Sequence, residues 1–288
     1  MSRNQNLILT LLSRNRNAKP RVCDAVPLGR TLPASSISTF SPAQAAEVVS
    51  SNIVGYQRLS IPANGYALLA NPFVEVGTGS TDPVGYAING MFADDVDNSN
   101  AGNSGASGDV IQTWDTATQG YNTWFYSSRI TGGAWADAST PRVAATDTFE
   151  FGDGYWYLNR GSEPFDITVS GEVSTKEVEV TLAANGYTLV CNPFPVDLPL
   201  NSENIDWSAA GSTAGNSGAS GDVIQTWDTE TQGYNTWFFS SRITGGAWAD
   251  ASTPRVPTTE AIPAGQGFWY LNRGSQDITI TLKSPIAE

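Results

Sequence analysis

Histidine is absent from this sequence, and cysteine occurs only twice, at Cys23 and Cys191. Without histidine there can be no Ser-His-Asp or Cys-His catalytic arrangement, no His-containing zinc site and no imidazole general base. Two cysteines exclude a disulfide framework and leave two interpretations, a pair of free thiols or one Cys23–Cys191 bridge. No GxxxxGK[ST] motif occurs, and no GxGxxG lies between a strand and a helix, so nucleotide chemistry has no support.

Basic residues are also scarce, with 15 lysines and arginines against 28 acidic residues and a formal charge of −13. An acidic protein is a poor partner for nucleic acid and for anionic membranes. The apolar run Leu7–Leu12 is too short to span a membrane, and Arg14 and Arg16 follow it where a signal peptide would have its cleavage site. We therefore expect no nucleic-acid partner, no membrane span and no standard export signal.

The first 51 residues differ from the rest of the chain. Six of the 15 cations lie within the first 30 residues, whereas the other 258 residues carry 9 basic and 27 acidic side chains. Apart from a short helix expected at Pro42–Val49, the segment has no clear period. We interpret it as an extended basic arm, with a solvated tail as the alternative. The candidate contacts of the arm are Arg14, Arg16, Lys19, Arg21 and Cys23.

A block of 43 residues is present twice, at Ala101–Val143 and Ala214–Val256. Only two positions differ, where Ala117 and Tyr126 become Glu230 and Phe239. The flanks repeat more loosely, NGYALLANPF as NGYTLVCNPF and GYWYLNRGS as GFWYLNRGS. We predict an arm of residues 1–51 followed by two repeats, 52–172 and 173–288. Selection for one contact surface and gene conversion both explain the near-identical block.

Within each repeat, short runs rich in β-branched and aromatic residues alternate with Gly, Pro, Asn and Asp. Examples are VEVTL, YTLVC, DVIQTW, YNTWFF, GFWYLN and DITITL. No window holds a helical apolar period. The pattern predicts an all-β chain of two tandem antiparallel β-sandwich or barrel-like domains, with six or seven strands in each.

The order of these landmarks resembles that in tandem β domains of bacterial surface and secreted proteins. Those domains, of Bacteroidetes, planctomycete and verrucomicrobial type, carry GWNLIGNPYP-like and PGQGFW-like motifs. The resemblance covers nearly all of residues 56–283 and rests on turn and core residues. It implies the fold and an extracellular or cell-surface location, but no particular activity.

Four aspartates of each repeat have counterparts in the other: Asp109/Asp222, Asp115/Asp228, Asp137/Asp250 and Asp166/Asp277. A carboxylate pair suffices for glycoside hydrolysis. Asp115 and Asp228 follow a strand at a tight turn, however, where aspartate caps the turn. We therefore predict that the protein is not an enzyme. The oxygens of Asp94, Asp95 and Asp97 offer a single calcium site, with a solvated acidic loop as the alternative, and no other cofactor is expected.

Aromatic residues are abundant, and eight of the nine tryptophans form matched pairs between the repeats. Strand alternation places Phe125 on one face of its strand and Trp124 and Tyr126 on the other. One face can be core, and the other is predicted to meet a sugar ring, another domain or another subunit. The tryptophans expected outside the core are Trp135 and Trp248, in a Gly- and Ala-rich loop. The candidate contact residues are Trp124, Tyr126, Trp135, Trp237, Phe239 and Trp248.

The expected function is structural. Two copies of one surface favour a self-assembling homopolymer, an extracellular filament, tube or surface layer, in which each arm adds a strand to the open sheet edge of a neighbour. The alternative is a tandem glycan-binding module that uses the paired aromatic residues as platforms. Deletion of residues 1–51 separates the two, because it removes the polymer in the first case and leaves glycan binding intact in the second.

Overall fold

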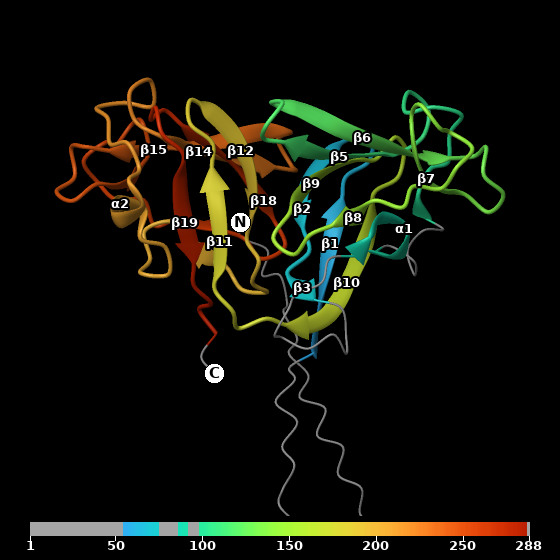
Figure 1. Ribbon diagram of the computed structural model, residues 1–288, viewed down its shortest axis with the longest axis horizontal. Helices are drawn as coiled ribbons and strands as arrows, with labels where there is room; N and C mark the ends of the chain where they lie inside the picture. The colour runs from blue at the N-terminus through green and yellow to red at the C-terminus, as the bar shows by residue number, and fades with distance from the viewer. Residues whose placement is uncertain (1–53, 75–85, 92–97, 287–288) are drawn as a thin grey trace, which may run out of the picture. The chain divides into compact units, whose positions relative to one another are not determined.

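The computed structural model describes residues 54–74, 86–91 and 98–286, all of which belong to one compact unit. The named strands pair only in antiparallel fashion, in two similar halves (Figure 1). The predicted all-β fold with two repeated antiparallel sandwiches is thereby confirmed. The predicted six or seven strands in each repeat were too few, because two-residue strands such as β3, β4, β13 and β17 bring the described strands to ten and nine. The helix predicted at Pro42–Val49 lies outside the described residues.

The described residues of the first half form three sheets and one short helix, α1 (Ile88–Met91). A three-stranded sheet has the order β1-β10-β3, a five-stranded sheet the order β2-β9-β5-β6-β7, and β4 pairs with β8. The strands are β1 (Val54–Ile61), β2 (Tyr66–Ala70), β3 (Phe73–Val74), β4 (Tyr86–Ala87), β5 (Val110–Asp115), β6 (Gly120–Ser127), β7 (Ala134–Asp137), β8 (Thr148–Phe149), β9 (Gly154–Leu158) and β10 (Phe165–Val173).

The second half repeats this plan with one helix, α2 (Trp207–Ala210). Its five-stranded sheet has the equivalent order β12-β18-β14-β15-β16, while β11 pairs with β19 and β13 with β17. The strands are β11 (Val178–Leu182), β12 (Gly186–Cys191), β13 (Leu198–Pro199), β14 (Val223–Asp228), β15 (Gly233–Ser240), β16 (Ala247–Ala249), β17 (Ala261–Ile262), β18 (Gly267–Asn272) and β19 (Ile278–Leu282).

Each half is a sandwich because the inward residues of its two main sheets share one core. In β1, exposed and buried residues alternate without interruption, as a strand with one face on the core requires. Leu59 and Ile61 of β1 and Ile167 of β10 join Tyr155 and Tyr157 of the five-stranded sheet in one cluster. An equivalent cluster fills the second half and includes Leu182, Ile280 and Tyr270.

A buried aspartate fixes the loop before β5 in each half. Asp109 is fully buried and accepts hydrogen bonds from the backbone N–H groups of Asn100 (2.9 Å) and Arg160 (2.8 Å) and from the Tyr157 hydroxyl (3.0 Å). Asp222 makes the equivalent three bonds in the second half. Burial raises the pKa of Asp109 above its ordinary value, against the lowering effect of these bonds.

Candidate functional site

The structure contradicts the predicted exposure of two tryptophans. Trp135 and Trp248 are each 0% exposed and lie in the two cores, not outside them. The backbone N–H of Trp135 donates to Asn89 Oδ1 at 2.8 Å, and that of Trp248 donates to Asn201 Oδ1 at 2.9 Å. The segment predicted as a Gly- and Ala-rich loop instead forms the strands β7 and β16, which these long-range bonds fix against the core, and each indole meets Tyr157 or Tyr270 edge-on.

The other four predicted contact residues are buried as well. Trp124 and Tyr126 belong to the first core, and Trp237 and Phe239 to the second. Assigning these six side chains to a partner surface was therefore wrong, because the chain itself covers them. The predicted arm contacts (Arg14, Arg16, Lys19, Arg21 and Cys23) and the predicted calcium ligands (Asp94, Asp95 and Asp97) lie outside the described residues.

The duplicated block contacts the other half of the same chain through the tip of its first hairpin. Gln119, between β5 and β6, has a left-handed backbone (φ 51°). Its Oε1 accepts from the Tyr187 N–H (2.9 Å), and its Nε2 donates to the Tyr187 carbonyl (3.0 Å). Trp114 Nε1 donates to the same carbonyl at 2.9 Å. The Gln119 amide and the Trp114 indole thus form hydrogen bonds with the backbone N–H and carbonyl of Tyr187 on the edge strand β12.

The reverse contact has the same geometry. Gln232, between β14 and β15, has φ 52°; its Oε1 accepts from the Tyr66 N–H (2.8 Å), and its Nε2 donates to the Tyr66 carbonyl (3.0 Å). Trp227 Nε1 donates to that carbonyl at 2.9 Å. The two halves therefore form an approximately two-fold interface, in which each hairpin contacts the edge strand of the other half.

Aromatic side chains cover this interface. We define the Trp269 set as Trp114, Tyr121, Tyr187 and Trp269. Trp269 contacts Trp114 (centroids 5.0 Å apart), Tyr187 (6.0 Å) and Tyr121 (6.3 Å), each edge to face. The equivalent Trp156 set contains Trp227, Tyr234, Tyr66 and Trp156, with distances of 5.1, 5.9 and 6.3 Å from Trp156 to Trp227, Tyr66 and Tyr234.

These rings leave a groove open to solvent. It has a volume of about 240 Å³ and is lined by the Trp269 set together with Gln225 and Tyr234, which we call the aromatic groove. Its lining contains no charged side chain. Gln225 Nε2 donates to Thr236 Oγ1 at 3.2 Å, which orients the amide. Partial burial raises the pKa of Tyr121, and the neighbouring Tyr234 and Tyr66 hydroxyls raise it further.

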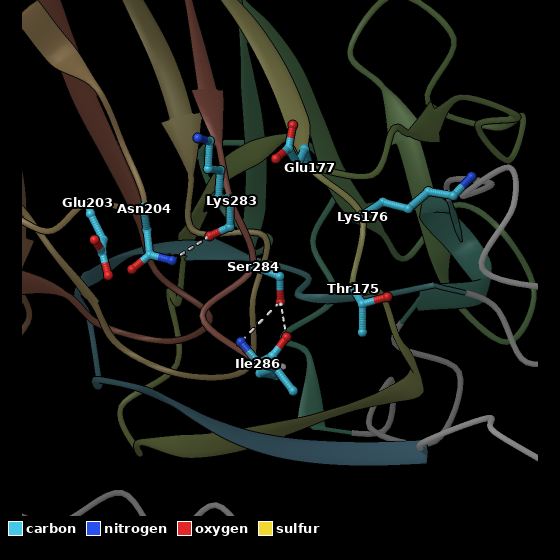
Figure 2. A pocket seen from close by; sticks show the side chains of 8 residues that line it. All are labelled: Thr175, Lys176, Glu177, Glu203, Asn204, Lys283, Ser284 and Ile286. Atoms are coloured by element: carbon cyan, nitrogen blue, oxygen red, sulfur yellow. Dashed lines mark hydrogen bonds between the residues drawn. The ribbon is translucent and has the colours of Figure 1, made fainter. Parts of the chain in front are cut away.

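A larger cleft, of about 660 Å³, lies beside the C-terminal segment (Figure 2). Lys283 donates its N–H to the Asn204 carbonyl (2.9 Å), and the Asn204 amide donates to the Lys283 carbonyl (3.2 Å). The cleft has no aromatic lining residue, and in Figure 2 the side chains of Lys176, Glu177 and Lys283 point in different directions. Its polar groups do not converge on one ligand position.

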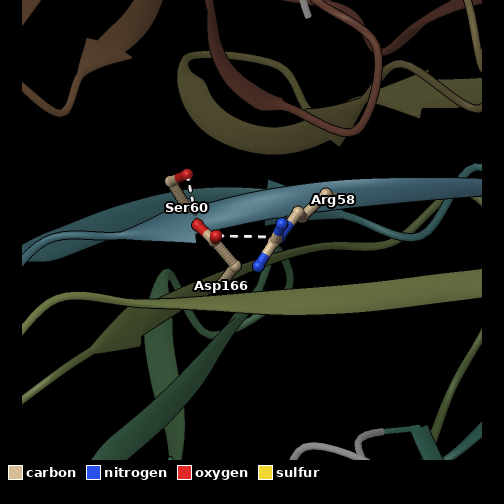
Figure 3. Close-up of polar contacts among 3 residues, drawn as sticks. All are labelled: Arg58, Ser60 and Asp166. Atoms are coloured by element: carbon tan, nitrogen blue, oxygen red, sulfur yellow. Dashed lines mark hydrogen bonds and ion pairs between the residues drawn. The ribbon is translucent and has the colours of Figure 1, made fainter. Parts of the chain in front are cut away.

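The matched aspartates have structural partners. Asp115 Oδ1 accepts from the N–H groups of Ala117 (2.9 Å) and Thr118 (3.2 Å), so the predicted turn-capping role is confirmed. Asp166 accepts from Arg58 Nε at 2.8 Å and from Ser60 Oγ at 2.5 Å across β1 and β10 (Figure 3). Arg58 is mostly exposed, so this pair adds little stability. Among the described residues, no group of three His, Cys, Asp or Glu is placed to hold a metal ion.

Sequence reasoning missed the tyrosines of the interface. In the sequence, Tyr66 and Tyr187 are recognisable only as the last residue of the repeated NGY motif. Tyr121 and Tyr234 are recognisable only as the residue that follows the hairpin glycine. The available signal was the spacing in WDTATQGY and WDTETQGY, which brings an indole, an amide and a phenol to one hairpin tip. The sequence left a sugar ring, another domain and another subunit open as partners of this hairpin, and in the structure Trp114 and Trp227 on its first strand bond to the opposite half of the chain.

The fold and the aromatic groove together define an all-β protein of two similar halves with an uncharged aromatic groove at the approximately two-fold interface between them. Comparison of the chain with protein-family models, with curated proteins and with solved structures gave no match. Within the described part of the chain, no helix has both the length and the apolar character needed to cross a bilayer.

Proposed function

We propose that this protein is a non-catalytic glycan-binding protein and that its aromatic groove holds a neutral oligosaccharide. The observation that carries the proposal is the clustering of exposed rings. Among the described residues, eight large apolar or aromatic side chains are exposed, and four of them are Tyr66, Tyr121, Tyr187 and Tyr234 at the interface. Exposed rings gathered at one place signify a binding surface rather than ordinary surface variation.

The chemistry of the groove favours a sugar. The apolar C–H face of a pyranose packs against an aromatic ring, while its hydroxyls need donors and acceptors at the rim. Tyrosine hydroxyls and the Gln225 amide supply both kinds of group. A volume of about 240 Å³ is below the roughly 300–1,000 Å³ of drug-sized pockets, so one subsite holds about one ring.

Charge argues for a neutral ligand. The groove lining has no lysine or arginine to pair with a phosphate, sulfate or uronate. The whole protein is also strongly acidic, with a formal charge of −13. Nucleic acids and anionic polysaccharides would be repelled. Hydrolysis is not proposed, because the matched carboxylates have structural partners: Asp115 and Asp228 cap turns, Asp109 and Asp222 anchor loops, and Asp166 pairs with Arg58. An extracellular or cell-surface location suits such a ligand and stays part of the proposal.

Affinity electrophoresis in gels containing hydroxyethylcellulose, xylan or galactomannan tests the proposal, with alginate as the anionic control. We expect retardation by at least one neutral polymer and none by alginate. The double variant Tyr121→Ala/Tyr234→Ala should lose the retardation. Tyr56→Ala is the matched control, because Tyr56 is a similarly exposed tyrosine (42%) on β1 outside the groove. Equal loss in the control, or no retardation of the wild type, would contradict the proposal.

A second candidate is assembly into an extracellular filament, tube or layer. Open sheet edges favour it: among the described strands, β1 pairs only with β10 and β11 only with β19. An acidic body and the basic residues 1–51 have complementary charge. Electron microscopy of the full-length protein and of a variant lacking residues 1–51 tests it. Ordered polymer from the first alone supports assembly, and dispersed particles from both refute it.

A further inference from the structure

We infer that the interface holds two equivalent sugar subsites, so that the ligand is a chain of at least two rings and not a single sugar. The inference rests on the proposed function, since it concerns the same site. It depends on one further observation, which is that every lining group of the aromatic groove has a counterpart in the other half of the chain.

The ring contacts of the two sets agree closely. Trp114 and Tyr121 are 4.9 Å apart with an interplanar angle of 72°, and Trp227 and Tyr234 are 4.9 Å apart at 74°. Tyr187 lies 6.0 Å from Trp269, and Tyr66 lies 5.9 Å from Trp156, with both pairs close to perpendicular. A ring that fits one set therefore meets the same surface in the other.

The polar groups are duplicated as well. Gln112 Nε2 donates to Thr123 Oγ1 at 3.0 Å, as Gln225 Nε2 does to Thr236 Oγ1 at 3.2 Å. The amide that lines the groove beside Trp269 thus has an equivalent, oriented in the same way by a threonine on the neighbouring strand. Both amides are partly exposed.

The two subsites adjoin one another. The aromatic groove is lined by Tyr121 from the Trp269 set and by Tyr234 from the Trp156 set. Partial burial raises the pKa of both Tyr121 and Tyr234, and neighbouring tyrosines of the interface raise it further. Tyr121 and Tyr234 therefore lie where the two subsites meet, and Tyr187 and Tyr66 belong to one subsite each.

Binding two linked rings side by side raises affinity, because the second ring binds at a high effective concentration. The test is calorimetric titration with β-1,4-linked gluco-, xylo- and manno-oligosaccharides of one to six units. We expect affinity to rise by about tenfold or more from one unit to the length that spans both subsites, and then to level off. Tyr66→Ala and Tyr187→Ala should weaken binding of the six-unit chain to a similar extent, with Tyr56→Ala as control.

If an alanine variant unfolds early, Gln112→Glu and Gln225→Glu replace it, since each adds one charge to one subsite and removes no ring. Binding without length dependence, or loss in only one variant of an equivalent pair, would overturn the two-subsite inference and leave the proposed function intact. Absence of binding to every neutral polysaccharide and oligosaccharide would overturn both.

Discussion

Gln119 and Gln232 combine an unfavourable backbone with a favourable contact. A non-glycine residue in the left-handed region carries local strain, which persists only where its surroundings hold it. Here each side-chain amide makes two hydrogen bonds to one backbone residue of the opposite half. The strained turn directs the amide toward the edge strand. These hydrogen bonds explain why glutamine occupies a left-handed position that asparagine or glycine adopts with less strain.

Gln119→Ala should lower the free energy of unfolding by about 0.5–1.5 kcal/mol, because it keeps the strained backbone and removes two solvent-accessible hydrogen bonds to Tyr187. Gln232→Ala should have a similar effect. Urea denaturation followed by tryptophan fluorescence measures the change. Glu230→Ala serves as control, because the first repeat has Ala117 at that position and Glu230 is exposed. A cost no greater than that of the control would refute the role of the glutamines.

Trp248 provides a second test at this scale. Trp248→Ala should cost about 3–5 kcal/mol, the range for truncating a buried aromatic residue, and Trp135→Ala should cost a similar amount. Thermal unfolding measures the loss. A variant as stable as the wild type would contradict the placement of these indoles in the two cores.

Asp109 makes the free energy of unfolding depend on pH in a direction that its pKa shift determines. Burial raises its pKa in the folded protein above the unfolded value near 3.8. The folded state then takes up the proton more readily, so this group favours folding increasingly as pH falls through its folded pKa. The effect of Asp115 on stability has the opposite sign, because hydrogen bonds from Thr118 lower the pKa of its carboxyl group. The stability that Asp115 contributes is lost as pH falls through that lowered pKa.

Urea denaturation at several pH values from about 7 down to about 4 checks this sign. The stability difference between wild type and Asp109→Asn should shift in favour of the wild type as pH falls. Asp115→Asn should show no such gain. A difference for Asp109→Asn that moves in the opposite direction would contradict the assigned shift.

At the scale of elements, strand position followed from local pattern. GFWYLN and VEVTL, predicted as strands from their composition, coincide with β18 and β11. Period-2 alternation also placed Phe125 opposite Trp124 and Tyr126, as their separate clusters confirm. Such features depend on neighbouring residues only, so a single sequence contains them.

The strands β7 and β16 and their burial did not follow from local pattern. TGGAWADAST has the composition of an exposed loop, yet Ala134–Asp137 within it form β7, and Asn89, 46 residues before Trp135, bonds to the backbone of that tryptophan in the core. The aromatic groove depends on residues that are farther apart, since Trp114 bonds to Tyr187 across 73 positions. Contacts of this range are fixed by packing, which repeats and turn motifs do not specify.

At the scale of the whole molecule, the duplicated block acquires a physical explanation. In a two-fold interface each contact occurs twice, with the hairpin of one repeat bonded to the edge strand of the other. Equivalent hairpin residues therefore face equivalent edge strands, and the same residue type is favoured in both copies. Both repeats accordingly hold the Trp, Gln and Tyr of the hairpin and the Tyr and Trp that receive it. The two differing positions, Ala117/Glu230 and Tyr126/Phe239, make none of these cross-interface hydrogen bonds.

The most direct test of the account is the response of the nine tryptophan indoles to a neutral glycan. Indole ¹⁵N-labelled protein would be titrated with cellohexaose, xylohexaose or mannohexaose and followed by NMR, with Tyr56→Ala and Tyr121→Ala/Tyr234→Ala beside the wild type. We predict that the indole signals of Trp114, Trp156, Trp227 and Trp269 shift together, that the five core indoles stay in place, and that the double variant abolishes the shifts. Shifts confined to the core indoles, or no shift with any of the three glycans, would contradict a glycan site at the interface.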